Sequence, residues 1–425
     1  TREAFLFLAV LACGCTNESH TKSGRVPAGE GPADDGEGED GNEHTGGTRR
    51  FAWGVVVSTM QLVHESVDPV ICPSGWTELQ AELATRGEGQ LPPLQAAYVN
   101  RFDDIYHFAR GGIAARNAIG DIIPTIRFST VWPCWTANES WRTGMAQVVQ
   151  DLIAVGWQVE LTLLHHDSYP AELHKQNGVK LGGWAHDSAA AEFIAYVESV
   201  VTTLRDVLPA GSRIYVANEL EASLFNGYLD QSGKWPPGGK NAGHSMFRAF
   251  LNARDALREG TRLISAAGFE PSIAVNVRPL LNDTGAAAER VLDHLHNWWL
   301  LDALVRGCND DVLTGSCDAV VEPAIQTIGL TYYGHMQPSG ETVELAPGIE
   351  MAVPIINVEP DADRFRKTLR SVRETYPNAA LGVAEIGFSS GSIGRMDGWL
   401  REYRDSVGLV LGYEKKHFIQ IHTLF

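Results

Sequence analysis

IYVANELEA, residues 214–222, places an asparagine and a glutamate directly after a run that is otherwise typical of a buried strand. Ile214, Tyr215 and Val216 are of residue types that favour strands. Glu219, in contrast, is ionisable and stands where the strand should leave the sheet. Burying such a group is costly unless it has partners. The place of this strand in the fold therefore decides what Glu219 can do.

Seven further short apolar runs accompany this one, and helical patterns lie between them. Two such patterns are residues 188–207 and 245–265, where apolar residues recur at helical spacing. The eight predicted strands are FAWGVVVS (51–58), IIPTIRFS (122–129), WQVELTLL (157–164), SRIYVAN (212–218), SIAVNVRP (272–279), TIGLTYY (327–333), ALGVAEI (380–386) and HFIQIHT (417–423).

The alternation of strands and helices predicts the fold class. Near-continuous apolar strands separated by helices indicate a parallel sheet covered by helices, and eight such units predict a closed (β/α)8 barrel, the TIM barrel. A doubly wound open sheet is the alternative. It requires a glycine-rich phosphate-binding turn after the first strand, and WGVVVSTMQ (53–61) contains none.

Composition limits the kind of partner. The chain has 425 residues, of which 44% are hydrophobic and 20% charged, enough to form one large domain or two of ordinary size. The formal net charge of −18 argues against nucleic acid, because phosphate binding requires clusters of lysine and arginine. Neutral or weakly charged substrates fit this chain better.

Residues 1–15 are predicted to be a processing signal. The apolar run 5–12 is too short to span a bilayer, and small residues accompany Cys13 and Cys15. VLACGC (10–15) resembles a bacterial lipobox, with Cys13 as the preferred lipid anchor and Cys15 as the alternative. An ordinary secretory signal is the other interpretation. Both predict a protein of the cell envelope, the periplasm or the extracellular space, lipid-anchored or secreted, and the lipid anchor is the one expected contact with a membrane. The sequence has no initiator methionine, so we expect that it starts inside the signal.

Residues 16–50 are predicted to be a disordered tether. They contain no apolar periodicity, and GPADDGEGEDGNEHTGG (31–47) is dominated by glycine and acidic residues. The catalytic domain is then expected to span residues 51–425.

Four cysteines lie in the domain, in a compartment where disulfides persist. Cys308 and Cys317 are close enough in sequence to form a bridge, which leaves Cys72 to pair with Cys134. Free buried thiols are the alternative. The spacing fits no zinc site.

Polar residues at the ends of the predicted strands are the candidates for function, because the active site of a (β/α)8 barrel lies where the strands end. Two of them, Glu219 and Glu385, are carboxylates on different strands, and a pair of carboxylates can supply the acid and the nucleophile of glycoside hydrolysis. For each one the alternative is a solvated or ion-paired glutamate. The candidates in chain order are Gln61, Arg127, His165, His166, Asp167, Asn218, Glu219, Tyr332, Tyr333, Glu385 and His422.

Short motifs follow one another across residues 51–425 in a familiar order. They are FAWGVVVSTMQ (51–61), RFSTVW (127–132), LTLLHHD (161–167), GGW (182–184), VANEL (216–220), GLTYYG (329–334) and VAEIG (383–387). In this order they resemble glycoside hydrolase family 1, the β-glucosidase family. The resemblance departs from the family where NEL replaces Asn-Glu-Pro, EIG replaces Glu-Asn-Gly, Thr331 replaces an asparagine and His166 replaces a tryptophan. These changes bear on the identity of the sugar rather than on the carboxylate pair.

The resemblance implies a retaining mechanism with no cofactor and a glycoside or oligosaccharide as substrate. In it, Glu219 is the acid/base and Glu385 the nucleophile. Arg127 and Tyr333 hold Glu385, and Asn218 contacts the sugar 2-hydroxyl. Further sugar contacts are expected from Gln61, His165 and His422.

Other interpretations of the same residues remain. One alternative is another (β/α)8 glycosidase that acts inside longer chains, such as an endo-acting β-glycanase, which would need an open cleft. A carbohydrate-binding lipoprotein without turnover is an alternative of a different class. The HHD triplet (165–167) does not predict a metal site, because adjacent strand residues point to opposite faces. HFIQIHTLF (417–425) stops where the family continues with a sugar-binding segment and the eighth helix, so we expect that this last helix is missing from the printed chain.

Overall fold

The computed structural model describes residues 52–57, 72–87, 125–165, 169–175, 181–357, 361–386, 402–403, 405–407, 409–410 and 418–422. Within them, all eight predicted strands are present. They are β1 (Ala52–Val57), β2 (Thr125–Ser129), β3 (Gln158–Thr162), β4 (Arg213–Asn218), β5 (Glu270–Asn276), β8 (Thr327–Tyr332), β11 (Ala380–Ile386) and β12 (Phe418–His422).

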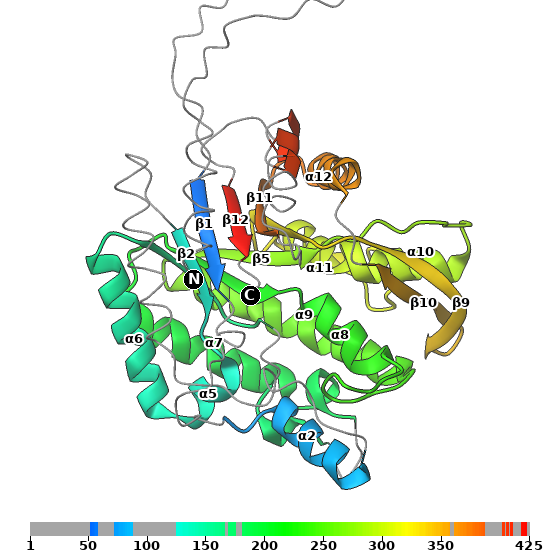
Figure 1. Cartoon of the computed structure of the whole chain (residues 1–425), viewed down its shortest axis with the longest axis horizontal. Helices are drawn as coiled ribbons and strands as arrows, with labels where there is room; N and C mark the ends of the chain where they lie inside the picture. Colours follow the sequence, from blue (N-terminus) through cyan, green and yellow to red (C-terminus); the bar gives the residue numbers. More distant parts are fainter. Residues whose placement is uncertain are drawn as a thin grey trace, which may run out of the picture.

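These strands form one closed parallel barrel in the order β1-β12-β11-β8-β5-β4-β3-β2. The ring closes where the first strand meets the last, in the register Ala52–Phe418 to Val56–His422, and Figure 1 shows β1 and β12 side by side. The predicted (β/α)8 barrel is therefore confirmed. A sheet without edges excludes the doubly wound alternative.

Helices cover the outside of the barrel where the sequence placed them. The patterns at 188–207 and 245–265 correspond to α7 (Ala189–Leu204) and α9 (Gly243–Ala266). The predicted apolar positions of α7 are buried, among them Phe193, Tyr196 and Val200, because they recur on one face. The described residues also form the helices and helical turns α2 (Gly75–Arg86), α5 (Trp132–Ala137), α6 (Glu139–Ala154), η1 (Ala171–Leu173), η2 (Gly183–Ala185), α8 (Leu220–Leu229), α10 (Ala287–Asp293), η3 (His294–Trp298), α11 (Trp299–Leu301), η4 (Asp302–Arg306) and α12 (Ala362–Thr375).

Polar caps fix where several helices begin. Asn138 accepts hydrogen bonds from two backbone N–H groups at the start of α6, and Asp361 accepts one from Arg364 at the start of α12. Ser74 and Thr77 form a capping box at the start of α2. Each cap satisfies donors that have no partner within the helix. None of the helices in the described ranges is both long and apolar enough to cross a membrane.

Two small antiparallel sheets stand outside the barrel and were not predicted. The hairpin β9 (His335–Ala346) and β10 (Ile349–Asn357) follows β8, and Figure 1 shows it as an arm running beside α10. The short pair β6 (Cys308–Asn309) and β7 (Ala319–Val320) closes the loop before β8.

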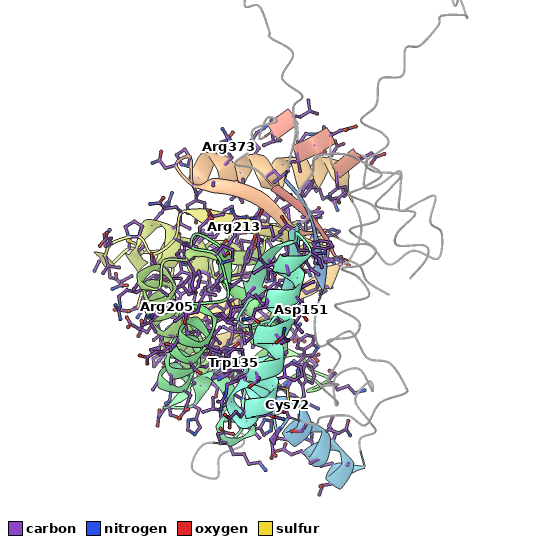
Figure 2. All side chains as sticks on the ribbon, turned by 90° about the vertical axis from the view of Figure 1, so that its left-hand side faces the viewer. Cys72, Trp135, Asp151, Arg205, Arg213 and Arg373 are labelled. Atoms are coloured by element: carbon purple, nitrogen blue, oxygen red, sulfur yellow. A yellow bond between two sulfur atoms is a disulfide. The ribbon has the colours of Figure 1, made fainter. Side chains whose placement is uncertain are left out.

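Both predicted disulfides are present. Cys72, just before α2, is bonded to Cys134 in α5, and Cys308 is bonded to Cys317 within the β6–β7 loop. Figure 2 shows Cys72 where the segment leading into α2 reaches the helices after β2. The alternative of free thiols is wrong for these four residues.

A layer of mostly small side chains fills the barrel interior. Tyr215, Ala274 and Ala384 form a buried cluster separate from the main core. Gly329 belongs to the same layer, since a Cβ added to it would lie 2.6 Å from the Cβ of Ala384 and 3.1 Å from the Tyr215 ring. The one large ring in this layer therefore fits only because its neighbours are small.

Candidate active site

Glu385, at the end of β11, is held by three side chains from three other parts of the barrel. Its Oε1 accepts a hydrogen bond of 2.9 Å from Arg127 Nη2 and lies 3.2 Å from His165 Nε2. Its Oε2 accepts one of 3.0 Å from the Tyr333 hydroxyl. All three contacts favour the ionised carboxylate, and they fix its orientation. The buried side chain is thus arranged as an oriented anion.

Arg127 is itself fixed on every side. Besides Glu385, its guanidinium donates to Thr162 Oγ1 at 2.9 Å, to Asn218 Oδ1 at 3.0 Å and to the Ala384 carbonyl at 3.0 Å. It also stacks over the Tyr215 ring, 4.6 Å from the centroid. A planar guanidinium can satisfy several acceptors at once, which a lysine could not. Arg127 therefore links β2 to β3, β4 and β11 beneath the site.

Glu219 has a different environment. It follows β4 directly and has φ of 50°, in the left-handed region that residues other than glycine rarely adopt. Such strain persists only where surrounding structure enforces it, and it concentrates at functional sites. Its Oε1 accepts a hydrogen bond from the Thr331 hydroxyl, and its side chain is buried.

Irregular strand pairing precedes both glutamates. The register of β4 against β5 shifts between Tyr215 and Asn218, and that of β11 against β8 shifts between Val383 and Glu385. An extra residue in a strand turns the following side chains relative to the pleat, and such bulges are common beside active sites. The shifts therefore determine which way Asn218 and Glu385 point.

Tyr333 is kept in its neutral, donating form. Burial raises its pKa well above the ordinary value, and the carboxylates of Glu385 and Glu219 raise it further. A protonated phenol is what the hydrogen bond to Glu385 requires. Its neighbour Tyr332 does not join the site. That ring packs between Phe365 and Tyr403, so the alternation along β8 sends one tyrosine inward and the other outward.

Six of the predicted site residues are brought together: Arg127, His165, Asn218, Glu219, Tyr333 and Glu385. The amide nitrogen of Asn218 is buried and has no hydrogen-bond partner in the part of the chain that the structure describes, so it keeps a donor for a ligand. Gln61, His166, Asp167, Cys13 and Cys15 lie outside the described residues. The backbone of His422 belongs to β12, and its side chain lies outside the description.

Two buried polar residues at the end of β5 and just beyond it, Asn276 and Arg278, were not among the candidates from the sequence. Both have side-chain nitrogen atoms that find no hydrogen-bond partner among the described residues. Glu221, in the first turn of α8, is also buried and accepts a hydrogen bond of 2.5 Å from the Asn276 backbone. The rule that found Glu219 and Glu385, polar residues at strand ends, would have found the two residues of β5 as well.

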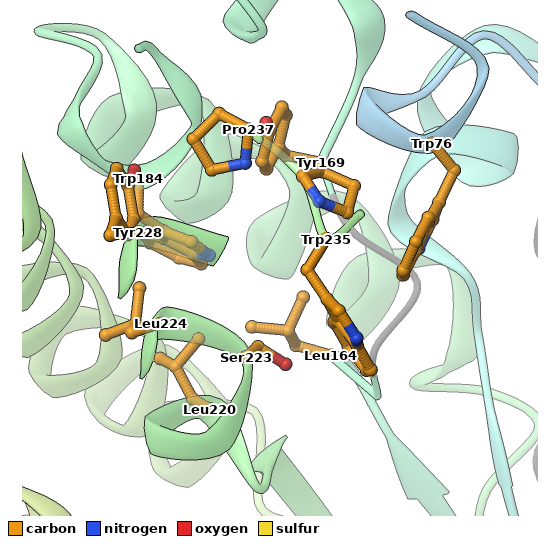
Figure 3. A pocket seen from close by; sticks show the side chains of 11 residues that line it. Trp76, Leu164, Tyr169, Trp184, Leu220, Ser223, Leu224, Tyr228, Trp235 and Pro237 are labelled. Carbon is orange, nitrogen blue, oxygen red and sulfur yellow. The ribbon is translucent and has the colours of Figure 1, made fainter. Parts of the chain in front are cut away.

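A pocket lies beside α8, on the side of the loops after β1 and β3. Figure 3 shows its aromatic walls, to which Trp76, Tyr169, Trp184 and Trp235 contribute, with Leu220 and Leu224 below them. Glu219 and Glu385 are not among the described residues that line it. Within the described ranges, no three His, Cys, Asp or Glu side chains gather in a way that would hold a metal ion.

Comparison with known proteins gives matches in structure alone. The sequence matches no protein-family model and shows no significant similarity to a curated protein sequence. The structure is similar to a β-glycosidase from Pyrococcus horikoshii, with TM-score 0.65 and 16% identity over 87% of this chain and 83% of that one. It is similar to a β-glucosidase from Thermotoga maritima in complex with azafagomine, with TM-score 0.66 and 17% identity over 88% and 87%. It is also similar to β-glucosidase 2 from the fungus Trichoderma reesei in complex with Tris, with TM-score 0.64 and 18% identity over 88% of this chain and 89% of that one. At this identity the likeness establishes a shared fold.

Proposed function

We propose that the protein is a retaining glycoside hydrolase that cleaves β-linked glycosides through a covalent glycosyl-enzyme intermediate. One observation carries the proposal. At one end of a closed barrel, three donor groups hold Glu385, whereas Glu219 follows β4 with a left-handed backbone and accepts a hydrogen bond from the Thr331 hydroxyl. Two carboxylates in unlike surroundings are what an acid and a nucleophile require. The shared fold with proteins described as β-glucosidases supports the same function.

The steps follow from these surroundings. In the first, Glu385 attacks the anomeric carbon while protonated Glu219 gives its proton to the leaving oxygen, so the glycosidic bond breaks as the ester bond forms. In the second, Glu219 takes a proton from water, whose oxygen attacks the same carbon and releases Glu385. Asn218, fixed by Arg127, offers its free amide donor to a sugar hydroxyl.

A panel of nitrophenyl β-glycosides tests the function directly. We expect turnover of at least one member, and Glu385→Gln should abolish it because the amide keeps the shape but is no nucleophile. Glu219→Gln should retain cleavage of substrates with very good leaving groups, and added azide should partly restore turnover because it needs no general base. Glu160→Gln is the matched control, since Glu160 is equally buried but pairs with Arg213.

The remaining outcomes identify the alternatives. Release of oligosaccharides from polymers without cleavage of nitrophenyl monosaccharides would replace our proposal with an endo-acting β-glycanase. Sugar binding without any turnover would indicate a carbohydrate-binding protein. Near-normal activity of Glu385→Gln would contradict the assignment of the nucleophile.

We further propose that the protein works outside the cytoplasm, as a lipid-anchored or secreted protein. Two disulfides agree with an oxidising compartment. Mass spectrometry of the mature native protein should find a lipid on Cys13 or Cys15. An unmodified N-terminus beyond Cys15 would leave only secretion.

A further inference from the structure

Arg278 is a buried cation that the proposed mechanism does not use. It lies two residues beyond the end of β5 and is 8% exposed. Its Nη1 is buried without a hydrogen-bond partner, and no side-chain hydrogen bond from it is found among the described residues. A guanidinium carries five N–H donors, and burying them unmet is unfavourable. These donors are therefore available to a ligand.

The backbone of Arg278 is firmly held although its side chain is not. Its N–H donates to Asn297 Oδ1 at 2.7 Å, and its carbonyl accepts from Asn297 Nδ2 at 2.8 Å. Asn297 lies in η3, a π-helical turn, and also donates to Asp293 at 2.8 Å. Turns of this kind occur often at functional sites. The fold thus positions Arg278 without using its charged group.

Arg278 has both carboxylates and a neutral histidine as electrostatic neighbours. Burial lowers the pKa of Arg278, and the nearby carboxylates of Glu219 and Glu221 act in the opposite direction. His296 is neutral, because burial and the charge of Arg278 lower the pKa of His296 to about 3. The guanidinium accordingly belongs to the electrostatic environment of Glu219 and Tyr333.

The order of strands places Arg278 on the leaving-group side. Around the ring, β5 lies between β4 and β8, whereas Arg127 and His165 come from the other side of β4. Arg278 is close to Glu219 instead: the Glu219 N–H donates to the Ala274 carbonyl of β5 at 2.9 Å, and the carboxylate of Glu219 acts on the charge of Arg278. Because Glu219 protonates the leaving oxygen in the proposed mechanism, a group beside Glu219 lies on the leaving-group side.

We propose that Arg278 binds an anionic group, a carboxylate or a sulfate, carried by the leaving-group part of the substrate. The inference rests on the proposed function, because it takes Glu219 as the acid. A planar guanidinium matches two oxygens of an anion, and such a contact gains more than one to a neutral hydroxyl. The proposal refines the expectation that substrates are neutral. The formal net charge of −18 repels anions at long range, whereas a direct contact with Arg278 would favour a substrate that carries one anionic group.

Sulfur-linked aryl glycosides test the inference without requiring turnover. Titration calorimetry would compare the affinity of phenyl 1-thio-β-glycosides with that of their 3-carboxyphenyl and 3-sulfophenyl counterparts. The sugar in these probes is the one cleaved best in the nitrophenyl panel, or glucose if none is cleaved. We expect an anionic probe to bind about 10- to 100-fold more tightly than the phenyl probe. Arg278→Met should remove this preference and leave the phenyl affinity within about threefold. The two anionic probes distinguish a carboxylate from a sulfate.

Two further variants separate binding from structure. Arg278→Lys should keep part of the preference, because the charge remains while the planar fork is lost. Arg213→Met is the matched control: Arg213 is paired with Glu160 and Glu270, so its loss should lower the thermal midpoint and leave the preference intact. Arg278→Met should not lower the midpoint. The inference would be overturned if the native protein bound anionic and neutral probes equally, or if Arg278→Met kept the preference. Failure to hydrolyse any member of the nitrophenyl panel would bear on the proposed function alone.

Discussion

Arg127→Met should destabilise the protein strongly, because it leaves Glu385 as a buried charge without its cation. Arg127 is completely buried and pairs with Glu385 at 2.9 Å. Removing one partner of a buried ion pair costs about 3–5 kcal/mol. With an unfolding entropy of about 2.1 cal/mol/K per residue, a domain of this size should lose about 4–6 °C in thermal midpoint.

A double-mutant cycle isolates the pair. Glu385→Gln alone should cost about 1–3 kcal/mol, since the amide cannot satisfy both Arg127 and Tyr333 as an anion does. The combined variant should be more stable than the sum of the single losses predicts, with a coupling of about 1–3 kcal/mol. Thermal unfolding of all variants followed by calorimetry at pH 7 measures these values. Exposed Arg205, changed to methionine, is the control and should shift stability by less than about 0.5 kcal/mol.

Activity gives the second measurement in the same experiment. Both single variants should lose at least about 100-fold in kcat/KM, because the proposed nucleophile is either unsupported or absent. A midpoint for Arg127→Met within about 1 °C of the native value, or strictly additive losses, would refute the reasoning, since the pair would then carry little of the site's organisation.

Three other perturbations address single features. The free energy of unfolding should fall as the pH is lowered from about 6.5 toward 3, because His296 binds a proton in the unfolded protein but not in the folded one, where its pKa is lowered to about 3. Thermal midpoints measured against pH should show a smaller loss for His296→Gln. Tyr333→Phe should lower kcat/KM about 10- to 100-fold, because it removes the hydrogen bond to Glu385. An unchanged kcat/KM would show that this hydrogen bond does not contribute to catalysis. Replacing Cys72 and Cys134 by alanine should cost about 4 kcal/mol in denaturant unfolding, the value for a loop of 62 residues, and a loss below about 1 kcal/mol would contradict the loop-entropy estimate.

The barrel could be predicted from the sequence because each strand is apolar along nearly its whole length and a helical pattern follows it. The hairpin β9–β10 could not, since Pro338, Gly340 and Pro354 are typical of loops and its strands pair outside the barrel. Strand bounds also moved where tertiary contacts decide them. The fifth strand ends at Asn276 rather than extending to residue 279, because Arg278 bonds through its backbone to Asn297.

The candidate site was predictable to the extent that strand ends converge. Which of two adjacent residues faces inward depends on register, so the strand pattern alone could not tell Tyr332 from Tyr333, and only the family resemblance named Tyr333. The shifts before Asn218 and Glu385 arise from pairing with neighbouring strands, which no local pattern records. Arg278 was overlooked although it obeyed the rule that found the others.

The layer beneath the site has an evolutionary consequence. Tyr215 supports the guanidinium of Arg127 from below, and it fits there because Gly329 has no side chain. A methyl group at Gly329 would collide with Ala384, whose carbonyl bonds to Arg127 and whose neighbour is Glu385. If the proposed function holds, mutation at these buried positions can change reactivity although they do not face the substrate. A laboratory selection for altered working pH should then find solutions in this layer, and descendants of this protein would diverge in rate with an unchanged substrate-facing surface.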